Sequence, residues 1–140
     1  MELIGRQLKM AANSLNQDFN RFADQYNLTG TQMSVIDFMA NCDLPECDQH
    51  MLEQEFNIKR STTTVLIQRL VKKGLVEQHQ SATDRRQKVI SLTEKGRELA
   101  PTVRQYIIAK EKTIKGAFSA DEVKHFMKIL NFIIEEGKND

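Results

Sequence analysis

The sequence is poor in the residues that mark several large classes of protein. It contains only two cysteines, Cys42 and Cys47, which do not make the disulfide framework of a small secreted domain. No apolar stretch is long enough to span a bilayer, and the first residues lack the apolar run of a signal peptide. We therefore expect a cytoplasmic protein that does not enter the membrane.

Motifs of catalysis and metal binding are also missing. The sequence has no glycine-rich phosphate loop, no nucleophile elbow and no cluster of metal ligands. Its three histidines, His50, His79 and His125, never take the i and i+4 spacing that is common in metal sites. We expect neither an enzyme nor a protein that carries a metal or another cofactor.

What is present is the composition of an ordinary globular domain with an uneven distribution of charge. The chain has 140 residues, of which 40% are hydrophobic and 28% charged, with a net charge of +1. Residues 59–88 hold eight lysines and arginines but only two carboxylates, Glu77 and Asp84, a local net charge of +6. The remaining residues carry 12 cations and 17 carboxylates, a net charge of −5. A basic segment in an otherwise acidic chain is typical of a binding site for a polyanion.

The spacing of apolar residues in the first half predicts four helices. Apolar side chains recur every three or four residues from Ile4 to Tyr26, which predicts a helix of about 20 residues or more. A second helix follows "NLTGT", whose two threonines are candidate N-caps. The segment "NCDLPECD" is predicted to be a loop, which contains Pro45 and ends at a capping Asp48.

A short helix then leads through a turn into a second one, a helix-turn-helix pattern. Asn57 suits the left-handed conformation that ends the short helix. The following helix begins near Ser61 and stops at Gly74 after two lysines. Next, "LVEQHQ" and "QKVISL" are rich in β-formers and flank "SATDRR", which predicts a hairpin with a charged tip. A helix-turn-helix followed by a hairpin is a winged helix.

The last third of the sequence predicts two further helices. Gly96 and Pro101 weaken the start of the first, so that the helix either bends near Pro101 or begins there. The segment "SADE", residues 119–122, is a capping box that opens the last helix. That helix has one apolar side, formed by Val123, Phe126, Met127, Leu130, Ile133 and Ile134. The terminal helices have more apolar positions than one small core needs, which suggests contact with a second subunit.

The helix that begins near Ser61 has two chemically different faces. Thr63, Leu66, Ile67 and Leu70 recur at the spacing of a buried stripe. The opposite face combines hydroxyls, an amide and cations without a carboxylate, whereas an ordinary solvated face mixes both signs. Its members are Ser61, Thr62, Gln68, Arg69 and Lys72. The hydroxyls suit phosphates or base edges, the amide suits an adenine edge, and the longer cations suit phosphates.

These features together resemble the MarR family of winged-helix transcription regulators. The resemblance rests on "HMLEQEFNIKRSTTTVLIQRLVKKGLVEQ" and "ATDRRQKVISLTEKG". The family pattern is a recognition helix that begins Ser-Thr, a leucine four residues past the second hydroxyl, and "KKGLV" leading into the wing. In the wing, Asp-Arg-Arg precedes Leu-Thr-x-x-Gly by a few residues. The order of helices matches over essentially the whole chain.

The resemblance implies a mainly α fold with a small β-hairpin, in which long N- and C-terminal dimerisation helices flank a winged helix-turn-helix. Residues 1–140 would form a single MarR-type domain, with a DNA-binding part at 28–96 and helical dimerisation parts at 1–27 and 97–140. The recognition helix would lie in the major groove of a pseudo-palindromic operator. The wing arginines would enter the adjacent minor groove, where a narrow groove concentrates negative potential. A small-molecule or oxidant signal often weakens binding in this family.

The residues that would contact double-stranded DNA lie on the helix and on the wing. On the helix they are Arg60, Ser61, Thr62, Thr64, Val65, Gln68, Arg69 and Lys72; on the wing they are Asp84, Arg85 and Arg86. Val65 departs from the family, which often has a polar residue there; either it contacts a thymine methyl group or the helix is slightly rotated. For Asp84 we expect that its carboxylate pairs with an arginine and shapes the wing tip.

Two groups of residues have both a functional and a structural interpretation. Cys42 and Cys47 could form a redox sensor, but two small, half-buried apolar residues are favoured. Tyr26, Met33, Phe38 and Met39 could line a cavity for an effector, but core packing is again favoured.

The function predicted from the sequence is that of a homodimeric DNA-binding regulator, and more specifically a repressor. The alternative is a winged-helix module that binds another protein rather than specific DNA. The local charge of +6 and the two wing arginines argue against the alternative.

Overall fold

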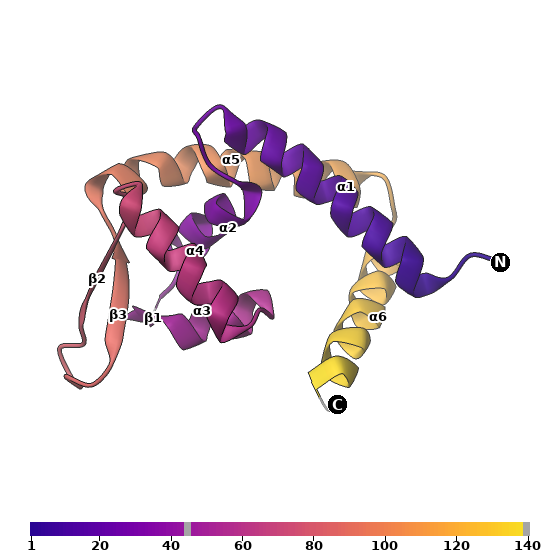
Figure 1. The fold of residues 1–140 in the computed structure, drawn as a ribbon. Helices are drawn as coiled ribbons and strands as arrows, with labels where there is room; N and C mark the ends of the chain where they lie inside the picture. Colours follow the sequence, from indigo (N-terminus) through magenta and orange to yellow (C-terminus); the bar gives the residue numbers. More distant parts are fainter. Residues whose placement is uncertain (44–45, 139–140) are drawn as a thin grey trace. The chain divides into compact units, whose positions relative to one another are not determined.

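Six helices and three short strands make up most of the described part of the chain, residues 1–43 and 46–138, in the computed structural model (Figure 1). The chain divides into two compact units, Met1–Val103 and Arg104–Asp140. The mainly helical fold with a small antiparallel sheet confirms the predicted winged helix-turn-helix class. Two residues of the predicted loop at 41–48, Leu44 and Pro45, lie outside the described residues.

The first two helices are α1 (Ile4–Asp24) and α2 (Gly30–Ala40). Of the two candidate caps, Thr29 is the residue that starts α2. Its side chain accepts a hydrogen bond from the backbone N–H of Gln32 at 3.1 Å, and the Gln32 side chain accepts one from the Thr29 N–H at 3.1 Å. This reciprocal pair satisfies two amides that a helix leaves without intrahelical partners. Tyr26, predicted at the end of the first helix, lies in the turn that follows it.

The helix-turn-helix consists of α3 (Gln49–Phe56) and α4 (Arg60–Lys72). Asp48 caps α3 as predicted, because its carboxylate accepts a hydrogen bond from the Met51 N–H at 2.9 Å. Asn57 ends α3 in the left-handed conformation, with φ 50° and ψ 50°, also as predicted.

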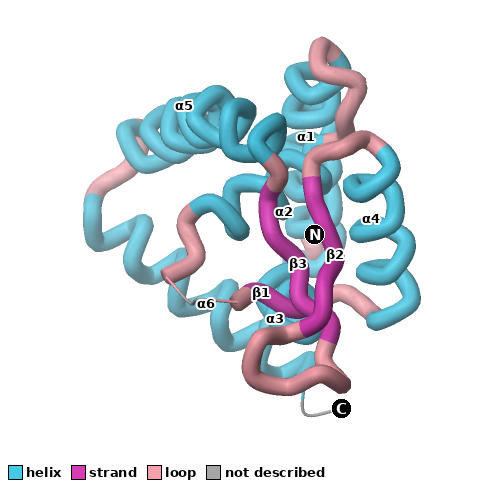
Figure 2. The backbone as a smooth tube through the Cα atoms, turned by 90° about the vertical axis from the view of Figure 1, so that its left-hand side faces the viewer, coloured by secondary structure: helices cyan, strands magenta, loops and turns pink. Residues whose placement is uncertain are grey.

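The hairpin strands are β2 (Val76–Gln80) and β3 (Lys88–Leu92), which pair antiparallel as predicted. Seven residues, 81–87, lie between them, one more than the predicted tip at 81–86, because β3 begins at Lys88 and not at Gln87. The prediction missed a third strand, β1 (Cys47–Asp48), which pairs with the other edge of β3 (Figure 2). A strand of two residues is too short to leave a period-two pattern in the sequence, and its residues were predicted to be loop.

The helix after the hairpin, α5 (Glu94–Gly116), begins before Pro101 and contains it. The alternative prediction of a start at Pro101 is therefore wrong. The first turn is stabilised by Thr93, whose hydroxyl accepts a hydrogen bond from the Gly96 N–H at 3.1 Å and donates one to the carbonyl of Gly74 at 2.7 Å. These local contacts outweigh the weak helix propensity of the residues around them.

The last helix, α6 (Ala120–Lys138), starts with the predicted capping box. The Ser119 hydroxyl accepts from the Glu122 N–H at 3.1 Å, and the Glu122 carboxylate accepts from the Ser119 N–H at 3.0 Å. None of the described residues of α6 is buried. Its large apolar side chains that are exposed are Phe126, Met127, Ile129, Phe132, Ile133 and Ile134.

The core of the first unit joins the helices to the sheet, and buried side chains lie on both faces of β3, since its neighbouring residues Val89 and Ile90 are both buried. Its largest fully buried side chains come from α2, α3, α4, β2, β3 and the middle of α5, and they are Met33, Val35, Ile36, Leu52, Ile67, Leu70, Val76, Val89 and Val103. Burial of each such side chain stabilises the fold by about 1.5–3 kcal/mol. This core fixes α4 and the hairpin relative to each other.

Gly96 gives the first test of the fold, because it allows the start of α5 to lie against the turn before β2. A Cβ atom at this position would lie 2.4 Å from the Leu75 carbonyl oxygen, which itself accepts a hydrogen bond from the Thr93 N–H. We expect Gly96→Ala to lower the free energy of unfolding by about 1–3 kcal/mol in urea denaturation, although alanine is the better helix former.

The matched control is Gly5→Ala in α1, where nothing lies within 4 Å of the added atom. This variant should be unchanged or more stable by up to about 1 kcal/mol. If both alanine variants were equally stable, close backbone approach at Gly96 would not be the reason for glycine there.

Candidate nucleic-acid interface

Helix α4 has one buried and one exposed face, as its sequence predicts. Thr63, Leu66, Ile67 and Leu70 are buried. The Thr63 hydroxyl donates a hydrogen bond to the Lys59 carbonyl at 2.9 Å, so this polar side chain is buried without an unpaired group. The exposed residues of α4 are Arg60, Ser61, Thr62, Val65, Gln68, Arg69, Val71 and Lys72.

The start of α4 is attached to α3 by Gln49, a residue that no local sequence pattern marks as important. The side-chain N–H₂ group of Gln49 donates to the Arg60 carbonyl at 3.1 Å and to the Thr64 hydroxyl at 2.8 Å. The Thr64 hydroxyl also donates to the Arg60 carbonyl at 2.9 Å. The hydroxyl of Thr64, a candidate for DNA contact, is therefore engaged inside the protein, where it helps to hold the first turn of α4.

The end of α4 is attached to the turn between α1 and α2. The Lys73 ammonium donates to the Asn27 carbonyl at 2.6 Å and to the side-chain oxygen of Gln32 at 3.0 Å. Gln32 is buried, and a buried amide without partners would be costly. The Lys95 ammonium donates in turn to the Lys73 carbonyl at 3.1 Å. Hydrogen bonds at both ends thus fix the direction of α4.

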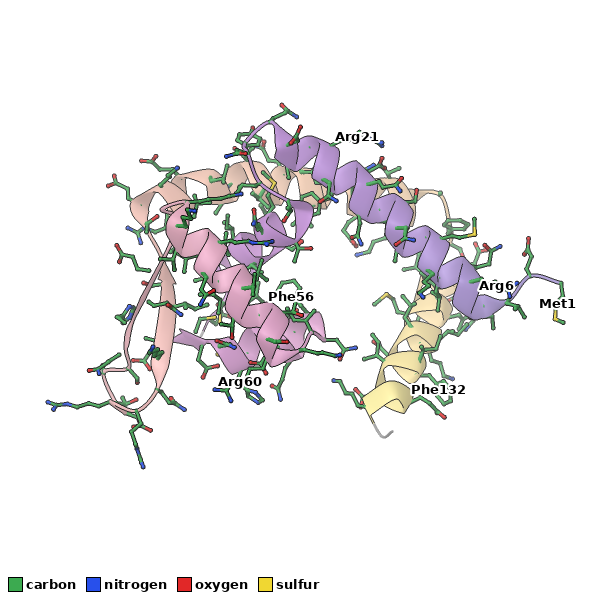
Figure 3. The ribbon with its side chains drawn as sticks, in the orientation of Figure 1. Met1, Arg6, Arg21, Phe56, Arg60 and Phe132 are labelled. Atoms are coloured by element: carbon green, nitrogen blue, oxygen red, sulfur yellow. The ribbon has the colours of Figure 1, made fainter. Side chains whose placement is uncertain are left out.

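The wing tip is organised around Asp84. Its carboxylate accepts a hydrogen bond from the Arg86 N–H at 3.0 Å and lies 3.6 Å from Arg86 Nε. The Arg86 side chain is 94% exposed, and Figure 3 shows long nitrogen-tipped side chains that project outward from the hairpin loop. The expected pairing of Asp84 with a wing arginine is therefore present, and the arginine is Arg86.

The base of the wing tip is held by Glu46, which precedes β1. Its carboxylate accepts a hydrogen bond from the Ser81 hydroxyl at 2.7 Å and another from the Ala82 N–H at 2.9 Å. These two hydrogen bonds, first that from Ser81 and then that from Ala82, lower the pKa of Glu46, because they favour the ionised form.

A groove of about 590 Å³ separates α4 from the wing and brings several predicted site residues together. We call it the wing groove; its lining residues are Asp48, Gln49, His50, Glu53, Arg60, Thr64, Gln68, Gln78, Arg86, Gln87 and Lys88. Figure 3 labels Arg60 at the start of α4. The cations Arg60, Arg86 and Lys88 and the amides of Gln68, Gln78 and Gln87 can make contacts with a phosphate backbone or with base edges there.

A second hollow of about 490 Å³ lies between the start of α2 and α4. Its lining combines Ser61, Thr62, Val65 and Arg69 of α4 with Thr29 and Thr31 at the start of α2, together with Gln32 and Leu66. The predicted site residues thus fall into two neighbouring sets, one on each side of α4. The other three line neither depression: Lys72 and Arg85, which are exposed, and Asp84, which is half-buried.

The residues that could either line an effector cavity or pack in the core also have defined positions. Met33 is fully buried, and Phe38 and Met39 are partly buried, which agrees with core packing. Tyr26 instead lines a pocket of about 520 Å³ with Asn27, Leu28, Lys73, Leu75, Lys95, Glu98, Leu99 and Thr102. In residues 1–43 and 46–138, no group of three or more His, Cys, Asp or Glu side chains could hold a metal ion, and no helix is long and apolar enough to cross a membrane.

Both cysteines are free; Cys42 is partly buried and Cys47 is buried. Burial raises the pKa of the Cys47 thiol to about 12, and the nearby Cys42 and Asp48 add to the increase. Because the thiolate is the reactive species, Cys47 has very little of it at neutral pH. This favours the structural interpretation of Cys47 over a redox role.

The reactivity of the two thiols tests that interpretation. With a thiol reagent at pH 7.5, we expect native Cys42→Ser protein to react at least about 100-fold more slowly than the same variant unfolded in urea, because its remaining thiol is Cys47. Cys47→Ser provides the comparison for Cys42. Rapid modification of Cys47 in the folded protein would restore it as a candidate sensor.

Comparison with known proteins agrees with a winged helix-turn-helix fold. The family model described as "MarR family" matches residues 26–87. The crystal structure of the transcription regulator MarR from Oenococcus oeni PSU-1 is 39% identical in sequence. The match covers 95% of this chain and 99% of that one, with a TM-score of 0.86.

Two more distant proteins have informative names. The MepR–DNA complex of S. aureus has a TM-score of 0.85 at 19% identity, covering 97% of this chain and 99% of that one. The homoprotocatechuate degradative operon repressor of Escherichia coli is 26% identical over 121 residues, which are 86% of this chain and 80% of that protein. The chain belongs to the MarR family, and it is a DNA-binding transcription regulator rather than an enzyme.

Proposed function

We propose that the protein is a homodimeric repressor that binds a pseudo-palindromic operator and is released from it by a small molecule or an oxidant. The observation that carries this proposal is the shared wing groove, into which both α4 and the wing contribute cations and amides. Because α4 and the wing lie on either side of this one depression in the protein, they can enter the major groove and the adjacent minor groove of a single DNA duplex.

The proposed roles follow from the position and chemistry of each side chain. Ser61 and Thr62, in the first turn of α4, contact phosphates or base edges near the helix start. Gln68 reads a base edge, and Val65 contacts a thymine methyl group. The longer cations Arg60, Arg69 and Lys72 bind phosphates. Arg85 and Arg86 enter the minor groove, and Asp84 holds the tip in shape.

The names of the relatives support two parts of this proposal. MepR of S. aureus is described in a complex with DNA, and the Escherichia coli relative is named as an operon repressor. Carried over to this chain, these names favour operator binding and repression over a winged helix that binds only protein. Retention on heparin that falls steeply with salt would separate these alternatives, since polyanion binding releases counterions.

The exposed apolar side of α6 supports the homodimer. Side chains such as Phe126 and Ile133, which are 51% and 37% exposed, lie at i and i+7 on the same side of this helix. Apolar side chains repeated along a helix are typical of a buried contact, and a second copy of the chain is its simplest partner. Two copies then place two recognition helices about one turn of DNA apart.

The pocket beside Lys73 gives the effector a place to act. Lys73 and Lys95 line it, and both ammonium groups bond to the backbone or side chains around the end of α4. An effector with an anionic group would compete for these lysines. The end of α4 would then lose its attachment to Asn27 and Gln32, and the spacing of the two recognition helices would change.

Selection of bound sequences from random duplex DNA tests the operator. We expect an inverted repeat whose half-site centres lie about 10 bp apart. If the dimer neutralises roughly eight phosphates, log K should fall with log salt at a slope of about −7. A flat salt response, or a selection that returns no repeat, would contradict operator binding.

A double substitution on α6 tests the dimer. Phe126→Glu with Ile133→Glu should produce a monomer in sedimentation analysis and lower operator affinity by at least about 100-fold, since each buried apolar side chain contributes about 1.5–3 kcal/mol. Lys128→Glu, an exposed change of charge on the same helix, should remain a dimer. A dimeric double variant with full affinity would place the subunit contact elsewhere.

A further inference from the structure

Glu46 lies before the helix-turn-helix, yet both of its carboxylate oxygens bind the start of the wing tip. Oε2 accepts the Ser81 hydroxyl at 2.7 Å, and Oε1 accepts the Ala82 N–H at 2.9 Å. These partners are 35 and 36 residues away in the sequence. Hydrogen bonds to an ionised acceptor are about twice as strong as neutral ones, so this contact is a firm attachment.

Ser81 also forms hydrogen bonds with the rest of the tip. The residue is only 4% exposed, and its hydroxyl oxygen accepts hydrogen bonds from the N–H groups of Thr83 and Asp84, both at 3.2 Å. A serine hydroxyl has one proton, and the carboxylate of Glu46 can only accept it. Glu46 therefore orients the hydroxyl so that its lone pairs face the amides of the tip.

Asp84 completes the series of contacts. Its amide is held by Ser81, its carboxylate accepts the Arg86 N–H at 3.0 Å, and its carbonyl accepts the Gln87 N–H at 3.1 Å. The contacts run without a break from Glu46 through Ser81 and Asp84 to Arg86. The Arg86 side chain is 94% exposed, so packing against other residues cannot hold it in place. Its position depends on these hydrogen bonds and on its ion pair with Asp84.

We propose that Glu46 is a positioning residue for the wing, which holds Arg86 in the orientation that enters the minor groove. This inference rests on the proposed DNA contact of Arg86. A tip that is already ordered loses less conformational freedom on binding than a loose one, so the anchor raises affinity without touching DNA.

The proposal predicts a sign opposite to that of simple electrostatics. Glu46 is a negative charge near a surface proposed to bind a polyanion, so a charge-only view expects its removal to tighten binding. Positioning expects removal to weaken binding, most strongly where Arg86 contributes most. That case is an operator with A·T-rich flanks, where the minor groove is narrower and more negative.

The first experiment measures the affinity of Glu46→Gln and of Ser81→Ala for operators with A·T-rich and G·C-rich flanks. Both should bind the A·T-flanked operator roughly ten-fold more weakly and the G·C-flanked operator with a smaller loss. Ser81→Ala breaks the same series but keeps the charge of Glu46. The matched control is Glu77→Gln, an exposed carboxylate on β2, which should bind as wild type or slightly tighter.

The second experiment combines each change with Arg86→Ala. If Glu46 acts through Arg86, Glu46→Gln should cause no further loss in the Arg86→Ala background. Additive losses, or tighter binding by Glu46→Gln than by wild type, would overturn the positioning role. If Arg86→Ala alone leaves affinity unchanged, the proposed wing contact itself is wrong, whereas a loss for Arg86→Ala without one for Glu46→Gln refutes only the anchor.

Discussion

The burial of one face of α4 is the constraint on which the rest of the interface depends. Leu66, Ile67 and Leu70 are buried, and burial of each stabilises the fold by about 1.5–3 kcal/mol. Successive residues of an α-helix are 100° apart, so a rotation by one residue would expose this stripe and bury cations in its place. The polar face of α4 therefore points to solvent, because any other rotation of the helix would expose its apolar face.

Apolar packing alone would still leave α4 free to tilt, and polar contacts at its two ends remove that freedom. Gln49 holds the first turn of α4. Lys73, the residue that follows the last turn, holds the other end through its hydrogen bonds to Asn27 and Gln32. Both contacts have strict geometry, whereas apolar contact is non-directional. The orientation of α4 is thus set by hydrogen bonds to α3, to the turn before α2 and to Gln32 of α2, and the proposed effector would act on this orientation by competing for Lys73.

The elements that were predicted correctly are those whose causes lie within a few residues. Asp48 and Ser119 cap helices through amides three residues away, and Asn57 takes its conformation from its own side-chain chemistry. The two faces of α4 follow from helical spacing alone. Local pattern was therefore enough for the winged helix-turn-helix and for the division of α4 into core and surface.

The features that were missed depend on partners far away in the sequence. Strand β1 exists because β3 offers a second edge, and Glu46 binds Ser81 across 35 residues. Neither leaves a periodic signal. Likewise, Gly96 weakens a helix in isolation, but the approach of the Leu75 carbonyl requires it. Thr64 was predicted to contact DNA, but its hydroxyl accepts a hydrogen bond from Gln49, which lies 15 residues away in the sequence.

The wing illustrates how an exposed functional element can be ordered without a core. Its ladder ends at the pair Gln80 and Lys88, and the tip beyond it has almost no apolar side chain to bury. Order in such a segment must come from hydrogen bonds. Those within the tip, made by Ser81 and Asp84, compete with bonds to water and gain from support outside the tip. A carboxylate from outside the hairpin meets this need. Glu46 accepts hydrogen bonds from Ser81 and Ala82 at the base of the tip, while the side chains of Arg85 and Arg86 at its end remain exposed to solvent.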